Sequence, residues 1–347
     1  MTEPASSPTT HDVSPAVALR HLCTGFWIAK AVAVAAELGI ADHLTHGSKT
    51  AAELAQRVGA HPGALYRLLR GIAGVGVFAE DAQGYFSMTP LAALLLTDHP
   101  QSWRAAAMLN GVPWIWQAWG DLLYSVRTGK PAFDHLFGME FDAYLAQHQD
   151  AADIFQAFMQ VATAEEALAV APIYDFVGMT TIVDVGGGRG ALLGAILQAN
   201  AHLRGVLFEA PHVIASARPA LEAQGVAERC QFVAGDFFDM LPAGGDAYIL
   251  KWILVSWDDE RAVTLLQNCH RAMGANGKLL VVERIIPTGN EPFFGKLADL
   301  NLLVLFKGHH RTEAEYRILF ARAGFTLSRI LPTYSPTEFS VIEGVPG

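Results

Sequence analysis

The chain has 347 residues, of which 52% are hydrophobic and 17% charged, and its formal net charge at pH 7 is −10. Lys and Arg form no cluster, and because neutralising phosphates requires concentrated basic residues, we expect no nucleic-acid partner. No uninterrupted apolar stretch reaches the length of a membrane span, so we expect none. The length allows two domains, and the apolar surplus suggests an extensive subunit interface or a large core.

Residues 1–14 are polar and proline-rich, with neither a basic leader nor an apolar signal core. We therefore expect a disordered tail on a cytoplasmic protein. The three cysteines lack C-x-x-C spacing, so we expect no metal site.

Residues 15–100 are predicted to form a winged helix. Apolar residues recur at helical intervals in 16–44, 50–58 and 62–77. Residues 78–88 have the pattern of a β-hairpin, which would be the wing. A winged helix can bind DNA, but DNA binding needs a basic recognition helix.

The helix that would read DNA is poor in basic residues. Residues 64–72 offer only Arg67 and Arg70, in a chain that is acidic overall. We therefore favour a role in dimerisation and pocket closure over DNA binding.

Residues 101–172 are expected to form a helical connector. The segment 91–126 is rich in aromatic residues, which more often pack in a core or an interface than around a substrate. The predicted helix 153–171 carries Met159 on an apolar face. Met159 is a candidate for the substrate pocket, and core packing is an equally good explanation.

The segment 181–190, TIVDVGGGRG, runs an apolar strand directly into a glycine cluster. Its apolar residues are typical of a buried parallel strand, and the glycines allow a tight turn that brings the backbone close to a ligand. From Gly186 and Gly188, the third glycine of a dinucleotide fingerprint would fall at Ala191, which the relaxed pattern permits. The turn alone therefore leaves NAD open. Asp184, inside the strand, is a further cofactor candidate.

Downstream of residue 173, predicted strands alternate with predicted helices. The strands are expected at 182–185, 205–209, 230–234, 247–251 and 278–284, and the helices at 191–199, 212–224, 260–273 and 312–323. This alternation predicts an α/β, Rossmann-like domain over residues 173–347, with a doubly wound parallel sheet. In such sheets the ligand lies at the carboxyl ends of the strands.

Chemistry-bearing residues stand at those predicted strand ends. Glu209 ends the second strand, Asp236 and Phe237 follow the third, Lys251 ends the fourth, and Trp257 comes shortly after. A carboxylate in this position can accept hydrogen bonds from the hydroxyls of a ribose. The residues by themselves therefore predict a nucleoside-binding domain.

The pattern D-x-G-G-G-x-G, followed about 20 residues later by an acid, resembles motif I of S-adenosylmethionine (SAM) dependent methyltransferases. With Gly235-Asp236-Phe237 and the run from Lys251 to Glu260, nearly the whole chain resembles plant-type, caffeate- and isoflavone-like small-molecule O-methyltransferases, as a bacterial member. The resemblance implies that Glu209 binds the ribose of SAM, that Asp236 faces the adenine amino group, and that Phe237 packs on the adenine ring.

The resemblance also implies an architecture and partners. The winged helix would form a homodimer and roof the pocket, the connector would line it, and the C-terminal domain would hold SAM under its glycine turn. The partner would be an aromatic or polyketide-like small molecule of secondary metabolism, methylated on a hydroxyl.

The chain departs from the family at the catalytic base. In the family, a His in a K-x-x-x-H-D-W run takes the phenol proton and is held by two Glu residues. Here the His position is Val255, in a pocket segment that includes Trp252. One supporting acid is kept as Glu283, and the other is replaced by His310.

Three interpretations follow. In the first, His310 is a relocated base oriented by Glu283. In the second, no base is needed, because the acceptor is an acidic hydroxyl or a nitrogen or carbon nucleophile. In the third, the fold binds SAM but catalyses hydroxylation, decarboxylation or a pericyclic reaction. For His309 and His310, a solvated loop is the plain alternative, and a metal site is disfavoured because adjacent loop residues rarely converge on one ion.

Overall fold

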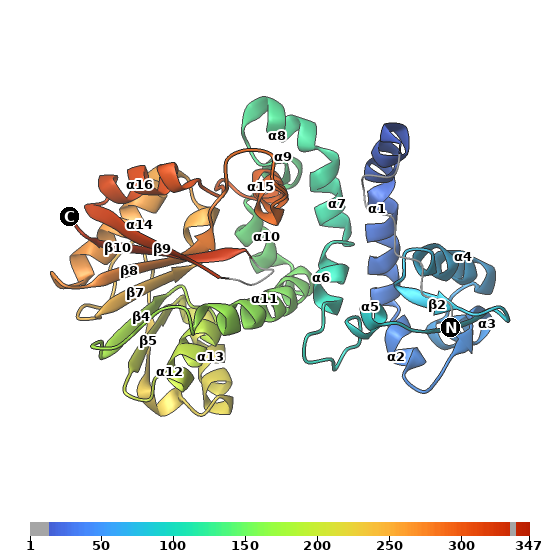
Figure 1. The fold of residues 1–347 in the computed structure, drawn as a ribbon, viewed down its shortest axis with the longest axis horizontal. Coiled ribbons are helices and arrows are strands. Elements are labelled where there is room, and N and C mark those ends of the chain that lie inside the picture. The colour runs from blue at the N-terminus through green and yellow to red at the C-terminus, as the bar shows by residue number, and fades with distance from the viewer. Residues whose placement is uncertain (1–13, 334–337) are drawn as a thin grey trace. The chain divides into compact units, whose positions relative to one another are not determined.

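The structure of the protein is a computed structural model that describes residues 14–333 and 338–347, apart from the side chain of Glu165 (Figure 1). The expected tail, residues 1–14, lies outside the described residues except for Ser14.

The chain divides into two compact units. The first comprises the chain up to residue 116 and residues 150–161, and the second comprises residues 117–149 and 162–347. The expected connector, residues 101–172, is not a unit of its own, because its segments pack partly in the first unit and partly in the second.

The first unit begins with four helices and a small sheet. These are α1 (Pro15–Glu37), α2 (Ile40–Leu44), β1 (Lys49–Thr50), α3 (Ala51–Val58), α4 (Pro62–Ala73), β2 (Phe78–Glu80) and β3 (Tyr85–Met88). The hairpin of β2 and β3 forms as predicted, and β1, which was not predicted, pairs with β3. Local chemistry sets the boundaries: Gly39 separates α1 from α2 at φ 63°, and Thr50 and Glu53 form a capping box that starts α3.

Helix α1 has an exposed apolar stripe. Leu19, Leu22 and Phe26 follow one another at helical intervals and are exposed, Leu22 by 79%. The helix is also long enough and apolar enough to cross a membrane, with a mean hydropathy of 1.3 over 18 residues. Arg20 and Lys30 interrupt the apolar residues of α1, so this finding does not contradict the expectation of no uninterrupted apolar span, which stays a prediction.

The helical region that follows is more broken than predicted. It contains α5 (Pro90–Ala93), α6 (Arg104–Leu109), α7 (Pro113–Gly120), α8 (Leu122–Thr128), α9 (Ala132–Phe137), α10 (Phe141–Gln147) and α11 (Gln149–Val170). Pro90 and Pro113 begin two of these helices, where the missing N–H of proline costs no hydrogen bond. Gly129 and Gly138 end two others with positive φ.

The second unit is built on a seven-stranded sheet with the strand order β6-β5-β4-β7-β8-β10-β9. The strands are β4 (Thr181–Val185), β5 (Arg204–Glu209), β6 (Cys230–Ala234), β7 (Ala247–Lys251), β8 (Lys278–Arg284), β9 (Phe325–Pro332) and β10 (Phe339–Pro346). The five predicted strands are confirmed and pair in parallel. Two strands that were not predicted, β9 and β10, extend this parallel sheet at one edge, where β10 runs antiparallel to both β8 and β9.

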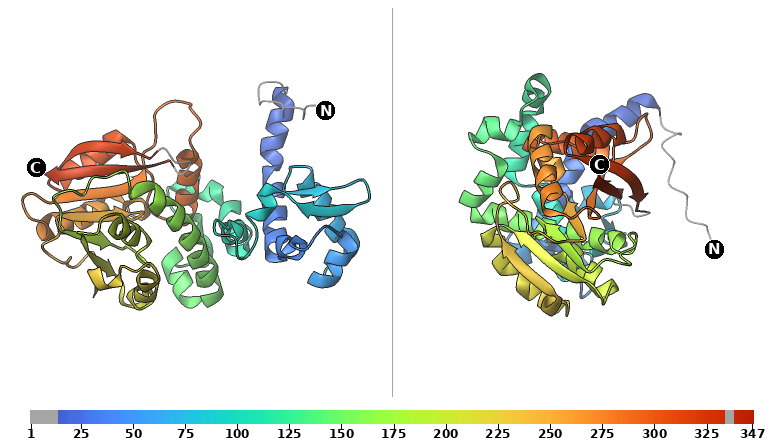
Figure 2. Two further views of the ribbon diagram at one scale, coloured as in Figure 1. Left: turned by 60° about the horizontal axis from the view of Figure 1, so that its bottom comes forward. Right: turned by 90° about the vertical axis from the view of Figure 1, so that its left-hand side faces the viewer.

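Helices cover both faces of this sheet (Figures 1 and 2). They are α12 (Ala191–Ala199), α13 (Pro211–Ala223), α14 (Asp259–Ala272) and α16 (Glu313–Arg322), with the short 3-10 helices η1 (Ala227–Arg229) and η2 (Leu254–Ser256). Helix α15 (Phe294–Leu305) packs against α8 and α9 instead. The four predicted helices are confirmed, and α15 was not predicted. Residues of α14 and α16 pack on one face, and residues of α12 and α13 on the other.

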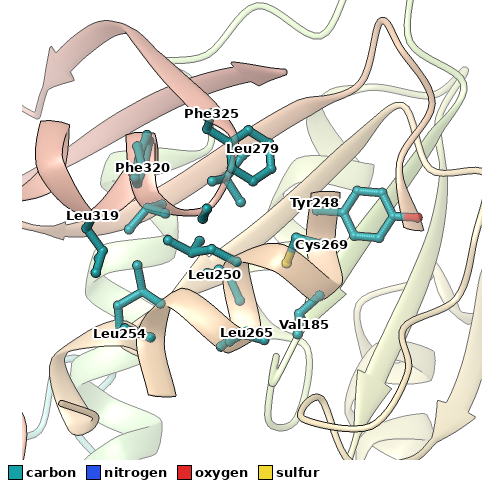
Figure 3. Packing of buried hydrophobic residues seen from close by; sticks show 14 of the residues in the cluster. Val185, Tyr248, Leu250, Leu254, Leu265, Cys269, Leu279, Leu319, Phe320 and Phe325 are labelled. Atoms are coloured by element: carbon teal, nitrogen blue, oxygen red, sulfur yellow. The ribbon is translucent and has the colours of Figure 1, made fainter. Parts of the chain in front are cut away.

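The two faces have separate apolar cores. Side chains alternate along each strand, so Val183 and Val185 of β4 pack toward α14 and α16, whereas Ile182 packs toward α12 and α13. Figure 3 shows the first of these cores, in which Leu250 of β7 packs together with Leu254 of η2. The core thus anchors η2 directly after β7, at the carboxyl edge of the parallel strands.

Candidate active site

The glycine turn after β4 forms one side of the site. Gly186, Gly188 and Gly190 have φ values of 67°, 59° and 80°, which only glycine adopts without strain. A Cβ on Gly186 would lie 2.6 Å from Cδ1 of Ile253, whereas a Cβ on Gly188 would meet no atom of the described residues within 4 Å. The turn therefore leaves open space beside Gly188 and leads into the N-terminus of α12, where backbone N–H groups favour an anionic ligand group.

Asp184 lies directly under this turn and is almost fully buried. Its side chain is 1% exposed, and neither carboxylate oxygen has a hydrogen-bond partner among the described residues. Burial raises the pKa of Asp184 to about 7, and the nearby charge of Lys251 acts in the opposite direction. Native proteins rarely leave such a group unsatisfied. The orphaned carboxylate beside the glycine cradle fits a ligand that brings hydrogen-bond donors or positive charge.

Glu209 supports the glycine turn from the end of β5. Its carboxylate accepts a hydrogen bond from Gly188 N–H at 2.9 Å and from Ala210 N–H at 2.7 Å. A carboxylate has about four acceptor positions, so Glu209 retains capacity for the hydroxyls of a ribose.

Asp236 and an aromatic group follow β6. The Asp236 carboxylate accepts from Phe238 N–H at 2.8 Å, which shapes the turn. The rings of Phe237 and Phe238 meet edge to face at 4.8 Å, and Trp257 stands edge-on to Phe238 at 4.9 Å. Arg261 covers this group, with its Cζ atom 4.0 Å from the Phe238 ring. The structure thus places Asp236, Phe237 and Trp257 in one cluster, and their contacts with adenine stay a prediction.

Lys251 is engaged by an acid that sequence reasoning missed. Its Nζ atom lies 3.0 Å from Oε2 of Glu166 in α11, and both side chains are almost fully buried. Alternation along β4 and β7 puts Asp184 and Lys251 on the same face of the sheet. A buried charge requires a partner. Because Lys251 ends a strand that was predicted to be buried, an acidic partner from a distant segment could have been expected.

The backbone after β7 is strained at Trp252. This residue has φ 60°, a conformation that is uncommon for a bulky side chain and costs roughly 1–3 kcal/mol. Its ring stacks on Phe339 at 5.8 Å, and its Nε1–H is buried with no partner among the described residues. Such strain persists where the surroundings hold it, here directly before η2. The assignment of Trp252 and Val255 to a substrate pocket stays a prediction.

Glu283 does not make the expected contact with His310. It is 0% exposed, and its carboxylate accepts from Val255 N–H at 3.1 Å and from the hydroxyl of Tyr316. Alternation along β8 directs Glu283 to the face covered by α16, whereas Arg284, the next residue, projects to the opposite face. The charge of Arg284, not that of Glu283, is among the influences on His310.

His310 lies in the loop before α16 and is 7% exposed. Its backbone N–H donates to Oδ1 of Asp299 in α15 at 2.6 Å, and its Nδ1 atom is buried without a partner among the described residues. Burial, and after it the charge of Arg284, lowers the pKa of His310 to about 3. The imidazole is therefore neutral at physiological pH and is a very weak base.

The loop that carries His310 packs tightly on η2. A Cβ on Gly308 would overlap the carbonyl oxygen of Val255 and lie 2.5 Å from the backbone nitrogen of Trp257. From the other end of the loop, Arg311 donates to the carbonyl oxygens of Leu254 and Trp257, at 3.0 Å each. Backbone of the His310 loop thus lies directly against the turn that carries Val255.

The structure assembles most of the predicted site residues at one edge of the sheet. Met159 belongs to the part of α11 in the first unit, where it is half-buried, and its role in a pocket stays a prediction. The residues that sequence reasoning missed are Glu166, Arg284, Asp299 and Tyr316. Besides Glu166, Arg284 had a signal, because it directly follows Glu283 and must face the other side of β8.

Two family models match the chain. A model described as an O-methyltransferase domain matches residues 119–326, and a model described as an O-methyltransferase dimerisation domain matches residues 20–98. The phenazine O-methyltransferase PhzM of Lysobacter antibioticus is 45% identical over 328 residues, which is 94% of this chain and 95% of that protein.

Solved structures of O-methyltransferases are similar to this chain over nearly its whole length. The crystal structure of LaPhzM has a TM-score of 0.91 and 45% identity, covering 96% of this chain and 100% of that one. NcsB1, an O-methyltransferase from neocarzinostatin biosynthesis solved with S-adenosyl-L-homocysteine and 1,4-dihydroxy-2-naphthoic acid, has a TM-score of 0.79 and 34% identity, covering 92% of this chain and 96% of that one. The orphaned acid, the glycine cradle and the strand-end carboxylates described above fit the adenosyl ligand of that structure.

Proposed function

The chain belongs to the O-methyltransferase family, and on that premise we propose that it methylates an acidic hydroxyl of an aromatic or polyketide-like metabolite without a protein base. It is a SAM-dependent enzyme of the type found in secondary metabolism. The observation that carries the proposal is the pair formed by Val255, which cannot take a proton, and His310, whose pKa is lowered to about 3.

SAM would supply an electrophilic methyl group on a sulfonium. The glycine turn and Asp184 would hold its amino-acid end, Glu209 its ribose, and the group of Asp236 and Phe237 its adenine. Lys251, paired with Glu166, would keep positive charge at the face shared with Asp184. In this arrangement the chain's own task is to orient the acceptor and exclude water, because an in-line displacement depends mainly on positioning.

The pKa of His310 supports a mechanism without a base. A phenol has a pKa of about 10. Taking its proton onto an imidazole with a pKa of about 3 would be uphill by roughly 7 units, or roughly 10 kcal/mol. A base contributes only about 10²- to 10⁴-fold when it is well matched. An acceptor that is already ionised, such as an enol or a quinone-type hydroxyl, avoids this cost.

We expect His310→Ala to retain methyl transfer to an acidic phenol within about 3-fold of the wild type, because no general-base contribution of roughly 10²-fold or more is lost. The measurement is S-adenosylhomocysteine release with a panel of hydroxylated aromatics that span several units of pKa. In the wild type, the pH at which the rate rises should follow the pKa of each acceptor.

The matched control places a base where the family has one. Val255→His should raise the rate on weakly acidic phenols more than the rate on acidic ones. If His310→Ala instead abolishes turnover of every acceptor while SAM binding is unchanged, His310 is the base and the proposal is wrong. If the wild type binds SAM and converts a substrate without releasing S-adenosylhomocysteine, the protein runs a different reaction on this fold.

We also propose that the protein is a cytoplasmic homodimer. The match to the dimerisation model begins at residue 20, so it includes Leu22 and Phe26 of the exposed apolar stripe of α1. A second copy of this stripe would remove Leu22 and Phe26 from water, which stabilises an interface by roughly 25 cal/mol per Å² of apolar area.

Leu22→Glu is expected to convert the protein to a monomer, because it places a charge in the middle of the proposed interface. Light scattering coupled to size-exclusion chromatography gives the mass directly. Gln56→Glu, at an exposed position of α3, adds the same charge elsewhere and should leave the dimer intact. A Leu22→Glu protein that remains dimeric would place the interface on another surface.

A further inference from the structure

The Glu283 carboxylate binds the backbone of η2 and not a catalytic side chain. Its two carboxylate oxygens divide between different elements: Oε1 accepts from Val255 N–H at 3.1 Å, and Oε2 accepts from the hydroxyl of Tyr316 in α16. Glu283 and Tyr316 are both 0% exposed. No solvent or substrate reaches this carboxylate through the protein surface described here, so its effect on the site must pass through η2.

Arg311 binds the η2 turn from a second side. Arg311 is 0% exposed and donates to the carbonyl oxygens of Leu254 and Trp257, while its guanidinium also binds Asp259 at 2.8 Å. Arg311 thus holds the carbonyl groups of the turn, and Glu283 holds an N–H group between them. Three residues of backbone are therefore fixed by charge-assisted hydrogen bonds, which are roughly twice as strong as neutral ones.

We infer that Tyr316 is a positioning residue: its hydroxyl holds the Glu283 carboxylate, and that carboxylate holds the η2 turn at which the acceptor reacts. The inference rests on the proposed function in one respect, namely that the acceptor reacts beside the η2 turn. Because the chain has Val255 where the family has its base, the hydrogen bond from Val255 N–H to Glu283 gives this carboxylate a structural task in the same reaction.

The arrangement predicts a pH response. Burial raises the pKa of Glu283 to about 7, and the groups that face it are Tyr316 from α16, Arg311 from the preceding loop, and the backbone N–H groups of Leu254 and Val255 from η2. The Tyr316 hydroxyl lowers this pKa. Removing the hydroxyl therefore raises the pKa of Glu283. The carboxyl group then stays protonated up to a higher pH, and in that form it is a weaker hydrogen-bond acceptor.

The test is amide hydrogen exchange of the segment 252–258 in the full-length protein without ligand, measured from pH 5 to pH 9 and corrected for intrinsic rates. In the wild type, protection should rise about 10-fold as Glu283 ionises, the size expected for a hydrogen bond to a charged group. Tyr316→Phe should move the midpoint to higher pH. Glu283→Gln, which keeps both hydrogen-bonding positions, should remove the pH dependence.

Tyr248→Phe is the matched control, because Tyr248 is equally buried in the same unit and its hydroxyl donates to Ala272 O at 3.0 Å, away from η2. It should lower stability without moving the midpoint. The inference is overturned if Tyr316→Phe exchanges with the wild-type midpoint, if Glu283→Gln keeps that midpoint, or if Tyr248→Phe shifts it equally. Hydrogen exchange is measured without turnover, so these outcomes do not depend on finding an acceptor. The test of the proposed function, in contrast, requires one.

Discussion

Asp184→Asn is expected to bind SAM about 10- to 100-fold more weakly than the wild type, because it removes a charged acceptor whose hydrogen bonds are worth roughly 1.5–3 kcal/mol. The same change should remove a pH dependence of folding. Burial raises the pKa of Asp184 from 3.8 to about 7 in the folded state. Between these values the folded protein binds more protons than the unfolded chain, so wild-type stability falls as pH rises.

The size of this fall follows from the shift. About 3 pKa units correspond to on the order of 4 kcal/mol between about pH 4 and pH 7. Urea unfolding at several pH values measures the fall, and calorimetry measures the SAM affinity. Asp175→Asn, which removes a carboxylate that caps Val177 N–H at 2.9 Å, leaves Asp184 in place and should keep the wild-type pH dependence and affinity. Equal SAM binding by wild type and Asp184→Asn would remove Asp184 from the cofactor site.

Gly308→Ala should lower kcat/KM by about 100-fold. Its Cβ would overlap the carbonyl oxygen of Val255 and lie 2.6 Å from the carbonyl carbon of Ser256, and both are backbone atoms that cannot rotate away. The His310 loop and η2 must therefore separate, and a displacement of about 1 Å at a reacting centre can cost about 10²-fold. The measurement is steady-state kinetics with an acidic phenol.

Gly274→Ala provides the control, because a Cβ at Gly274 meets no atom within 4 Å in the part of the chain that the structure describes. It should remain within about 2-fold of the wild type, since surface substitutions are usually worth less than about 0.5 kcal/mol. Calorimetry with SAM shows whether Gly308→Ala still folds and binds cofactor. Activity within a few-fold of the wild type would mean that the contact between this loop and η2 does not position the acceptor.

Local patterns in the sequence predicted the parallel strands and the glycine turn of the second unit. The apolar strand before the glycines, the acids at Glu209 and Asp236, and the alternation of strands and helices each depend on neighbouring residues only. The structure confirms the five parallel strands and brings their ends together. Local patterns did not predict the antiparallel pair β9 and β10 or helix α15. The positions of these elements depend on which sheet edge or loop is left exposed by the rest of the fold.

The sequence by itself predicted that a nucleoside-binding sheet follows a helical and winged N-terminal segment, and its resemblance to the family predicted that Val255 takes the place of the catalytic base. Only the tertiary structure decided the surroundings of His310 and Glu283, the two residues predicted to take over from that base. Whether His310 keeps a useful pKa depends on its burial beside Arg284, and whether Glu283 reaches it depends on the face of β8 from which Glu283 projects. Both follow from contacts between segments far apart in the chain, and these contacts made His310 a neutral group and turned Glu283 toward Tyr316.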